Sequence, residues 1–265
     1  MLNFLLYFFV FIFGLVIGSF LNCVIYRLEK KESALSGRSY CPHCKHQLKW
    51  YDLIPLLSFI ILKGKCRYCQ KPISIQYPLV ELATAFLFVL IFLRPNLETR
   101  FGLFNLDLFN FVFLLIIASV LIIIFVYDLK HYIIPDKVIF PAILLVLLYQ
   151  LIFNFQLNNF YSVLISAFGA ATFFLIIVLV TKGKGMGIGD IKLAFLMGLL
   201  LGWPNIFVAL FFAFLIGAIM GIGLILAHKK TLKSEVPFGP FLVTGTFIAL
   251  FWGKELINFY LNLFY

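Results

Sequence analysis

The sequence has little charge: only 12% of its 265 residues are Asp, Glu, Lys or Arg, whereas 63% are hydrophobic. A soluble domain has about 25% charged and about 45–50% apolar residues, so a soluble core of this size could not bury the excess. Cysteine is also scarce, with five residues in the whole chain. These shortages exclude a soluble globular enzyme, a disordered chain and a secreted disulfide scaffold, and they predict a polytopic membrane protein.

Long apolar runs fill most of the chain, and short polar breaks separate them. A transmembrane helix needs about 20 apolar residues. The runs predict an all-α membrane protein with about eight transmembrane helices, at residues 2–26, 78–93, 108–127, 138–155, 161–181, 191–203, 205–227 and 240–261. The first run is too long for a signal peptide and has no basic residue before it, so we expect a retained helix.

Positive charge exceeds negative charge by ten, with 21 Lys and Arg against 11 Asp and Glu. In a membrane protein such an excess collects in cytoplasmic loops and does not indicate nucleic acid. If the N-terminus lies outside, the cytoplasmic connections contain 18 of the 21 basic residues; these connections are 27–76, 128–137, 182–192 and 228–235. We therefore expect a multi-pass membrane protein with its N-terminus outside, a lipid bilayer as partner and no nucleic acid.

The connection at 27–76 is the only one long enough to fold outside the bilayer. It contains two CxxC pairs, Cys41/Cys44 and Cys66/Cys69. Each pair can present two thiolates to one ion, and four thiolates complete a tetrahedron around structural Zn²⁺ with no open position. The alternatives are two disulfides, which a reducing cytosol disfavours, or a redox pair. His43 and His46 are possible but weaker ligands.

Two aspartates mark the points where apolar runs meet the cytoplasmic side. Asp128 ends the third run, and Asp190 precedes the sixth within a Gly-x-Gly-Asp sequence. An ionisable side chain within the membrane is energetically costly, so its presence there indicates a functional role. Two carboxylates brought together share a proton, so that one can act as base and the other as acid. The alternative is structural: Asp190 could be an N-cap or first-turn residue, which the helix dipole favours, and Asp128 could be a solvated loop residue.

Several ordered motifs over most of the chain resemble those of the bacterial type IV prepilin peptidases, which are bifunctional membrane aspartic proteases of the GxGD class. The first motifs are GSFLN at 18–22, the paired CxxC loop with WYDLIP at 50–55, and YPLVEL at 77–82. Asp128 and the IPD at 134–136 follow. GIGDIKL at 187–193 and VPFGPFL at 236–242 complete the set.

The resemblance implies that Asp128 and Asp190 are catalytic. The enzyme would remove the basic leader peptide from type IV prepilins and pseudopilins at the cytoplasmic face of the bacterial inner membrane. It would then methylate the new N-terminal amine with S-adenosylmethionine. Residues that could support the dyad by position are Gly187, Gly189, Lys192, Pro237 and Gly239.

The implied organisation has three parts. Residues 1–26 form the first helix, 27–77 a zinc-binding domain linked to methylation, and 78–265 a seven-helix domain carrying the dyad. No nucleotide-binding fingerprint locates the S-adenosylmethionine site. A peptidase without methyltransferase activity is the alternative, and a transporter with a regulatory zinc ribbon is a weaker one, because the predicted spans have almost no charge at their centres.

Overall fold

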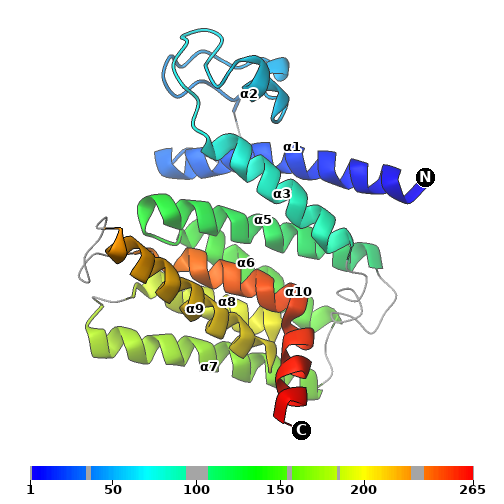
Figure 1. The fold of residues 1–265 in the computed structure, drawn as a ribbon, viewed down its shortest axis with the longest axis vertical. Coiled ribbons are helices and arrows are strands. Elements are labelled where there is room, and N and C mark those ends of the chain that lie inside the picture. The colour runs from blue at the N-terminus through cyan, green and yellow to red at the C-terminus, as the bar shows by residue number, and fades with distance from the viewer. Residues whose placement is uncertain are drawn as a thin grey trace. The chain divides into compact units, whose positions relative to one another are not determined.

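The computed structural model describes residues 2–33, 37–93, 107–153, 157–183, 186–227 and 236–264. These residues form helices and contain no strand, which confirms the all-α prediction (Figure 1). The chain divides into two compact units. Unit 1 comprises residues 1–95 and 108–123, and unit 2 comprises the remaining residues to 265.

Unit 1 is built on the pair formed by α1 (Leu2–Lys30) and α3 (Gln76–Phe92). A Cβ added at Gly18 of α1 would lie 2.6 Å from Cα of Glu81 in α3, so the two backbones approach closely there. The loop between them contains the short helices η1 (Trp50–Asp52) and α2 (Leu57–Ile61). Residues 108–123 of α5 (Asp107–His131) complete this unit.

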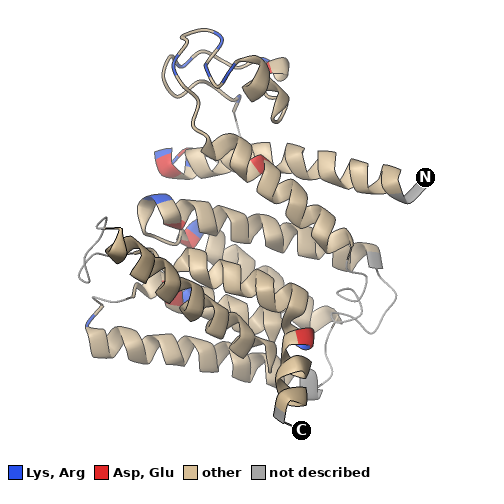
Figure 2. Ribbon diagram, viewed as in Figure 1, with Lys and Arg blue, Asp and Glu red and all other residues tan. Residues whose placement is uncertain are grey.

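Helix α1 continues one turn beyond the predicted span, which ends before the first charge. Arg27 in that turn is only 5% exposed, and its guanidinium donates to the Gly37 carbonyl oxygen at 2.8 Å. The helix therefore extends past its apolar part because the loop supplies a partner for this charge. Figure 2 shows charge at the C-terminal end of α1 and none along the rest of the described helix.

Unit 2 contains the end of α5 and five further helices: α6 (Asp136–Phe153), α7 (Leu157–Thr181), α8 (Ile188–Leu201), α9 (Asn205–Leu226) and α10 (Gly239–Phe264). Helix α8 packs against α6, α7, α9 and α10. Gly198 of α8 lies against the backbone of Ala167 in α7. Gln150 of α6 donates to the Leu199 carbonyl oxygen at 2.9 Å, which joins α6 to α8.

All eight apolar runs are helices, but the number of membrane spans remains a prediction. Among the described residues, six helices are long and apolar enough to cross a bilayer. Helix α3 has 17 residues and α8 has 14. From Leu193 to Leu201, eight of the nine residues of α8 are buried within unit 2, so its apolar character reflects contact with other helices and not with lipid. The predicted functional division at residues 26 and 77 also remains a prediction.

Candidate functional sites

The four predicted cysteines lie on two turns of the same design. In the first turn, the Cys41 N–H donates to the His46 carbonyl oxygen at 3.0 Å, and the Lys45 N–H donates to that of Cys41 at 2.9 Å. The second turn repeats both bonds, from Cys66 to Lys71 and from Gln70 to Cys66. Lys45 and Gln70 have positive φ values of 60° and 59°, which tighten both turns. This repeat aims two pairs of thiols at a common point.

The four sulfur atoms lie within 4.8 Å of one another, and the Sγ atoms of Cys41 and Cys69 are 3.9 Å apart. A tetrahedral Zn²⁺ site with bonds of about 2.3 Å requires about 3.8 Å between sulfurs. The cysteines are free thiols, unlike the disulfide alternative. His46 stacks on Tyr68, with ring centroids 3.8 Å apart, so its ring has a packing role. The four thiols therefore fit one metal ion.

The Cys41 thiol ionises more readily than an ordinary cysteine. Burial raises the pKa of its thiol, but hydrogen bonds from the backbone N–H groups of Cys44 and His43 outweigh burial and lower the pKa to about 7. The Cys69 thiol has the opposite tendency: its pKa is raised to about 11, because a backbone bond at Lys71 that lowers it is outweighed by burial and by the neighbouring sulfurs. Four thiols in contact cannot all ionise without a cation between them.

Asp52 of η1 fastens the rest of the loop to the second CxxC turn. Its carboxylate accepts hydrogen bonds from Arg67 Nε at 2.8 Å, the Tyr68 hydroxyl at 3.2 Å and the Lys49 N–H at 3.2 Å. Burial works against this charge, but these donors hold the pKa of Asp52 below its ordinary value. Sequence reasoning placed Asp52 within a motif but assigned it no role.

In unit 2, Asp128 lies in the last turn of α5 with 4% of its surface exposed. Its Oδ2 accepts a hydrogen bond from the Gly239 N–H at 3.0 Å, at the first residue of α10. A Cβ at Gly239 would lie 2.5 Å from that oxygen. Gly239 is thus the residue that allows the backbone of α10 to approach the carboxylate.

Asp190 lies in the first turn of α8 and is 7% exposed. Its Oδ2 accepts a hydrogen bond from the Gly187 N–H at 3.0 Å, so the carboxylate caps its own helix as the structural alternative anticipated. Gly189 faces the IPD segment, because a Cβ there would lie 3.0 Å from Cβ of Ile134. This capping role does not exclude a catalytic role for Asp190, since Asp190 also lines a cavity.

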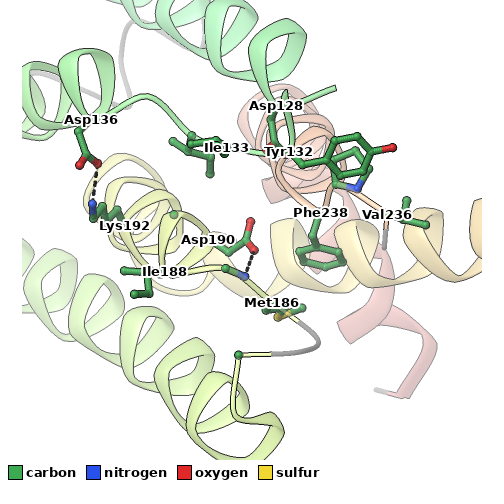
Figure 3. A pocket seen from close by; sticks show the side chains of 15 residues that line it. Asp128, Tyr132, Ile133, Asp136, Met186, Ile188, Asp190, Lys192, Val236 and Phe238 are labelled. Atoms are coloured by element: carbon green, nitrogen blue, oxygen red, sulfur yellow. Dashed lines mark hydrogen bonds and ion pairs between the residues drawn. The ribbon is translucent and has the colours of Figure 1, made fainter. Parts of the chain in front are cut away.

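This cavity has a volume of about 370 Å³ and is lined by residues from the ends of α5, α6 and α8 and from the segments that precede α6, α8 and α10. Asp128 and Asp190, which are 62 positions apart in the chain, both line it (Figure 3). Apolar side chains form much of the remaining wall; they are Ile133, Ile134, Met186, Ile188, Val236 and Phe238.

The predicted supporting residues have different places. Gly187, Gly189 and Pro237 line the cavity, and Gly239 contacts Asp128 directly. Lys192 also lines it, but its Nζ forms an ion pair with Asp136, as the dashed line in Figure 3 shows. Among the described residues, no bond from Lys192 to either buried aspartate is found.

Sequence reasoning missed Tyr132 and Met186, which line the cavity. Phe238 also lines it, and it lies between Pro237 and Gly239 in the VPFGPFL motif, in the segment that the sequence associates with the dyad. Tyr132 and Met186 had no usable signal, since a single aromatic or thioether residue beside an apolar run is ordinary.

Two family models match the chain. The "Bacterial Peptidase A24 N-terminal domain" covers residues 12–95, and the "Type IV leader peptidase family" covers residues 115–222. The second match includes both buried aspartates. The chain is also 36% identical to the prepilin leader peptidase/N-methyltransferase of Aeromonas hydrophila, over 96% of this chain and 93% of that protein.

The chain belongs to the type IV leader peptidase family. The prepilin leader peptidase/N-methyltransferase of Bacillus subtilis is 36% identical over 96% of this chain and 97% of its own length. That of Legionella pneumophila is 33% identical over 95% and 93%. No solved structure matches. The family assignment extends over both units, because one model covers the cysteine loop and the other covers both buried aspartates of the cavity.

Proposed function

We propose that this chain removes leader peptides from prepilins and pseudopilins with Asp128 and Asp190, and then methylates the new N-terminal amine. The observation that carries the proposal is the single cavity that both buried carboxylates line. Family membership supports the reaction, since relatives over nearly the full length are named prepilin leader peptidase/N-methyltransferase.

The arrangement suits peptide hydrolysis by an aspartate pair. Two neighbouring carboxylates share one proton, so one is a base and the other an acid. The ionised group takes a proton from water, whose oxygen attacks the scissile carbonyl carbon, while the other group protonates the carbonyl oxygen. The carbon–nitrogen bond then breaks: the leaving amine gains the proton that the first carboxylate took from water, and a hydroxyl of the tetrahedral intermediate returns a proton to the second carboxylate. In both residues Oδ2 accepts a hydrogen bond from a backbone N–H, so we expect Oδ1 to be the atom that contacts water and substrate.

The placement of charge supports cleavage at the cytoplasmic face of the bacterial inner membrane. The cavity is at the end of α5 where Lys130 and His131 lie, and 18 of the 21 basic residues fall on that side of the predicted topology. A prepilin whose apolar helix lies in the bilayer would present its leader junction at this depth. The N-terminus of the chain would then lie outside.

The proposed methyltransferase activity is supported by the presence of the cysteine loop and by the names of the relatives. When bound, S-adenosylmethionine supplies a methyl group to the terminal amine, which loses a proton as the sulfur–carbon bond breaks. The four thiolates of Cys41, Cys44, Cys66 and Cys69 would hold one Zn²⁺ and leave no open position, so the ion would stabilise the loop. A peptidase in which this loop is purely structural is the alternative.

The first test is an intact-mass assay of a prepilin mixed with purified enzyme in detergent. We expect Asp128→Asn and Asp190→Asn each to abolish leader loss. Glu255→Gln is the matched control, because it also replaces a carboxylate by an amide in α10, 16 residues from Gly239. Cleavage that survives both aspartate substitutions would overturn the proposed dyad.

The same assay with S-adenosylmethionine separates the two versions of the function. The wild-type product should gain the mass of one methyl group after losing its leader. Leader loss without this gain would favour the peptidase alternative.

A further inference from the structure

Helix α2 presents large aliphatic side chains to its surroundings. Leu57, Ile60 and Ile61 are 56%, 67% and 71% exposed. Their spacing of three and four residues places them on one face of the helix. The neighbouring Phe59 packs inward, with its ring 3.2 Å from where a Cβ at Gly64 would lie. Soluble surfaces rarely gather such residues without a partner.

The contacts between α1 and α3 show where α3 begins along the length of α1. Asn22 Nδ2 of α1 donates to the Tyr77 carbonyl oxygen in the first turn of α3 at 3.0 Å. Because a helix rises 1.5 Å per residue, Asn22 lies about 8 Å before Arg27, the first charge at the end of α1. Gly18, which faces Glu81, lies about 13 Å before it. The first turns of α3 therefore lie beside the apolar part of α1.

Glu81 connects this depth to α2. Its Oε2 accepts a hydrogen bond from the Leu56 N–H at 2.9 Å, and Leu56 is the residue immediately before α2. Leu56 has a φ of 59°, which is costly for a leucine and requires such support. The Glu81 side chain leans toward the N-terminus of its own helix. Measured along the axis of α3, Leu56 therefore lies between Glu81 and Tyr77.

Measured along α1, the start of α2 consequently lies several ångström from Arg27, toward the apolar part of α1. In Figure 1, α2 lies apart from α1 but, along the direction of that helix, it is level with α1 and not beyond its C-terminal end. An amphipathic segment at a membrane surface buries its apolar face about 5–10 Å into the boundary between headgroups and acyl chains, which matches this depth.

We propose that Leu57, Ile60 and Ile61 insert into the bilayer interface of the leaflet at the C-terminal end of α1. The charge of the loop fits this partner, since residues 31–75 contain eight Lys and Arg and two acidic residues, a balance that favours anionic headgroups. The cysteine loop is thereby anchored to lipid as well as to α3.

The test uses the full-length protein in nanodiscs, with or without lipids brominated near the headgroup end of the acyl chains. Trp50, Trp203 and Trp252 are first replaced by Phe, and a single tryptophan is then introduced by Ile61→Trp. Arg38→Trp, at an exposed position of the same loop, is the matched control. Ile60→Trp replaces the first variant if Ile61→Trp fails to fold.

We expect brominated lipid to quench the Ile61→Trp variant at least about twofold more than the Arg38→Trp variant, with emission shifted to shorter wavelength. Equal, weak quenching in both variants would overturn the proposal. So would an emission change that requires a prepilin and is insensitive to bromine, because the face would then bind protein. None of these readouts depends on peptidase or methyltransferase activity, so failure here leaves the proposed function untouched.

Discussion

At the scale of single residues, the main chain determines how the two buried aspartates are held. Each carboxylate has one oxygen fixed by a backbone N–H, from Gly239 for Asp128 and from Gly187 for Asp190. A side-chain substitution cannot remove these donors, but it can push them away. The two glycines differ in this respect, because a Cβ would contact Asp128 Oδ2 at 2.5 Å from Gly239 but Asp190 Oδ2 only at 3.8 Å from Gly187.

Gly239→Ala should therefore lower leader cleavage by roughly 100-fold, because displacing a catalytic group by about 1 Å has an effect of that size. Gly187→Ala should lower it far less, since its φ of −87° suits alanine and the added methyl has room. Initial rates of prepilin cleavage at saturating substrate measure both variants. An equal loss of cleavage rate in the two variants would show that the contact between the added Cβ and the aspartate does not determine the rate.

Asp52 gives a prediction about the cysteine loop. Asp52→Asn keeps an oxygen for Arg67 but loses the charge, so release of Zn²⁺ to a chelator should be roughly fivefold faster, corresponding to about 1 kcal/mol. The folded pKa of Asp52 is below the ordinary 3.8, so this stabilisation is present above that value and lost as the pH falls through the lower one. The ratio of wild-type to variant release rates should thus stay constant from neutral pH down to about pH 5. A ratio of one at neutral pH would contradict the role given to Asp52.

At the scale of helices, apolar runs and cysteine spacing predicted most of what the structure contains. All eight runs are helices, and the two CxxC pairs meet at one point, because both features depend on local sequence. Contacts between residues far apart in the chain were not predictable from the residues alone. Gly239 was named as a supporting residue, but its hydrogen bond to Asp128, 111 positions away, was not, and Lys192 contacts Asp136 across 56 positions instead of a buried aspartate. Nor could hydrophobicity alone show that α8 is buried by other helices, since protein and lipid interiors favour the same side chains.

The contact between α7 and α8 supports the position of Asp190 and can be tested with matched glycines. Gly198→Ala would force its methyl group into the backbone of Ala167 and should destabilise the protein by about 1–3 kcal/mol. Gly221→Ala in α9 has open space around its Cβ and should be neutral or stabilising by up to about 1 kcal/mol. Apparent midpoints of thermal unfolding in one detergent compare the two. A stable Gly198→Ala variant would contradict the close approach of α7 and α8.

At the scale of the whole molecule, the two candidate sites belong to different compact units. The four cysteines lie in unit 1, and the cavity with both aspartates is lined entirely by unit 2. Each site is completed by residues of its own unit: Asp52 supports the second cysteine turn, and Gly239 supports Asp128. This separation implies that loss of the metal would disturb one reaction and leave the other intact.

Simultaneous replacement of Cys41 and Cys44 by serine tests that separation. Two of four thiolates are then missing, so bound Zn²⁺ should fall from one per chain to near zero. Methylation should be lost if the loop serves it, whereas leader cleavage should stay within about twofold of wild type, because the two sites belong to different compact units and independent sites without shared partners do not couple. Cys23→Ser is the control, since Cys23 is a thiol of α1 outside the metal cluster. Metal analysis and intact-mass assays of one preparation give all three quantities. Loss of cleavage together with the metal would show that the loop also acts on the aspartate cavity, and methylation without metal would leave the loop a purely structural element.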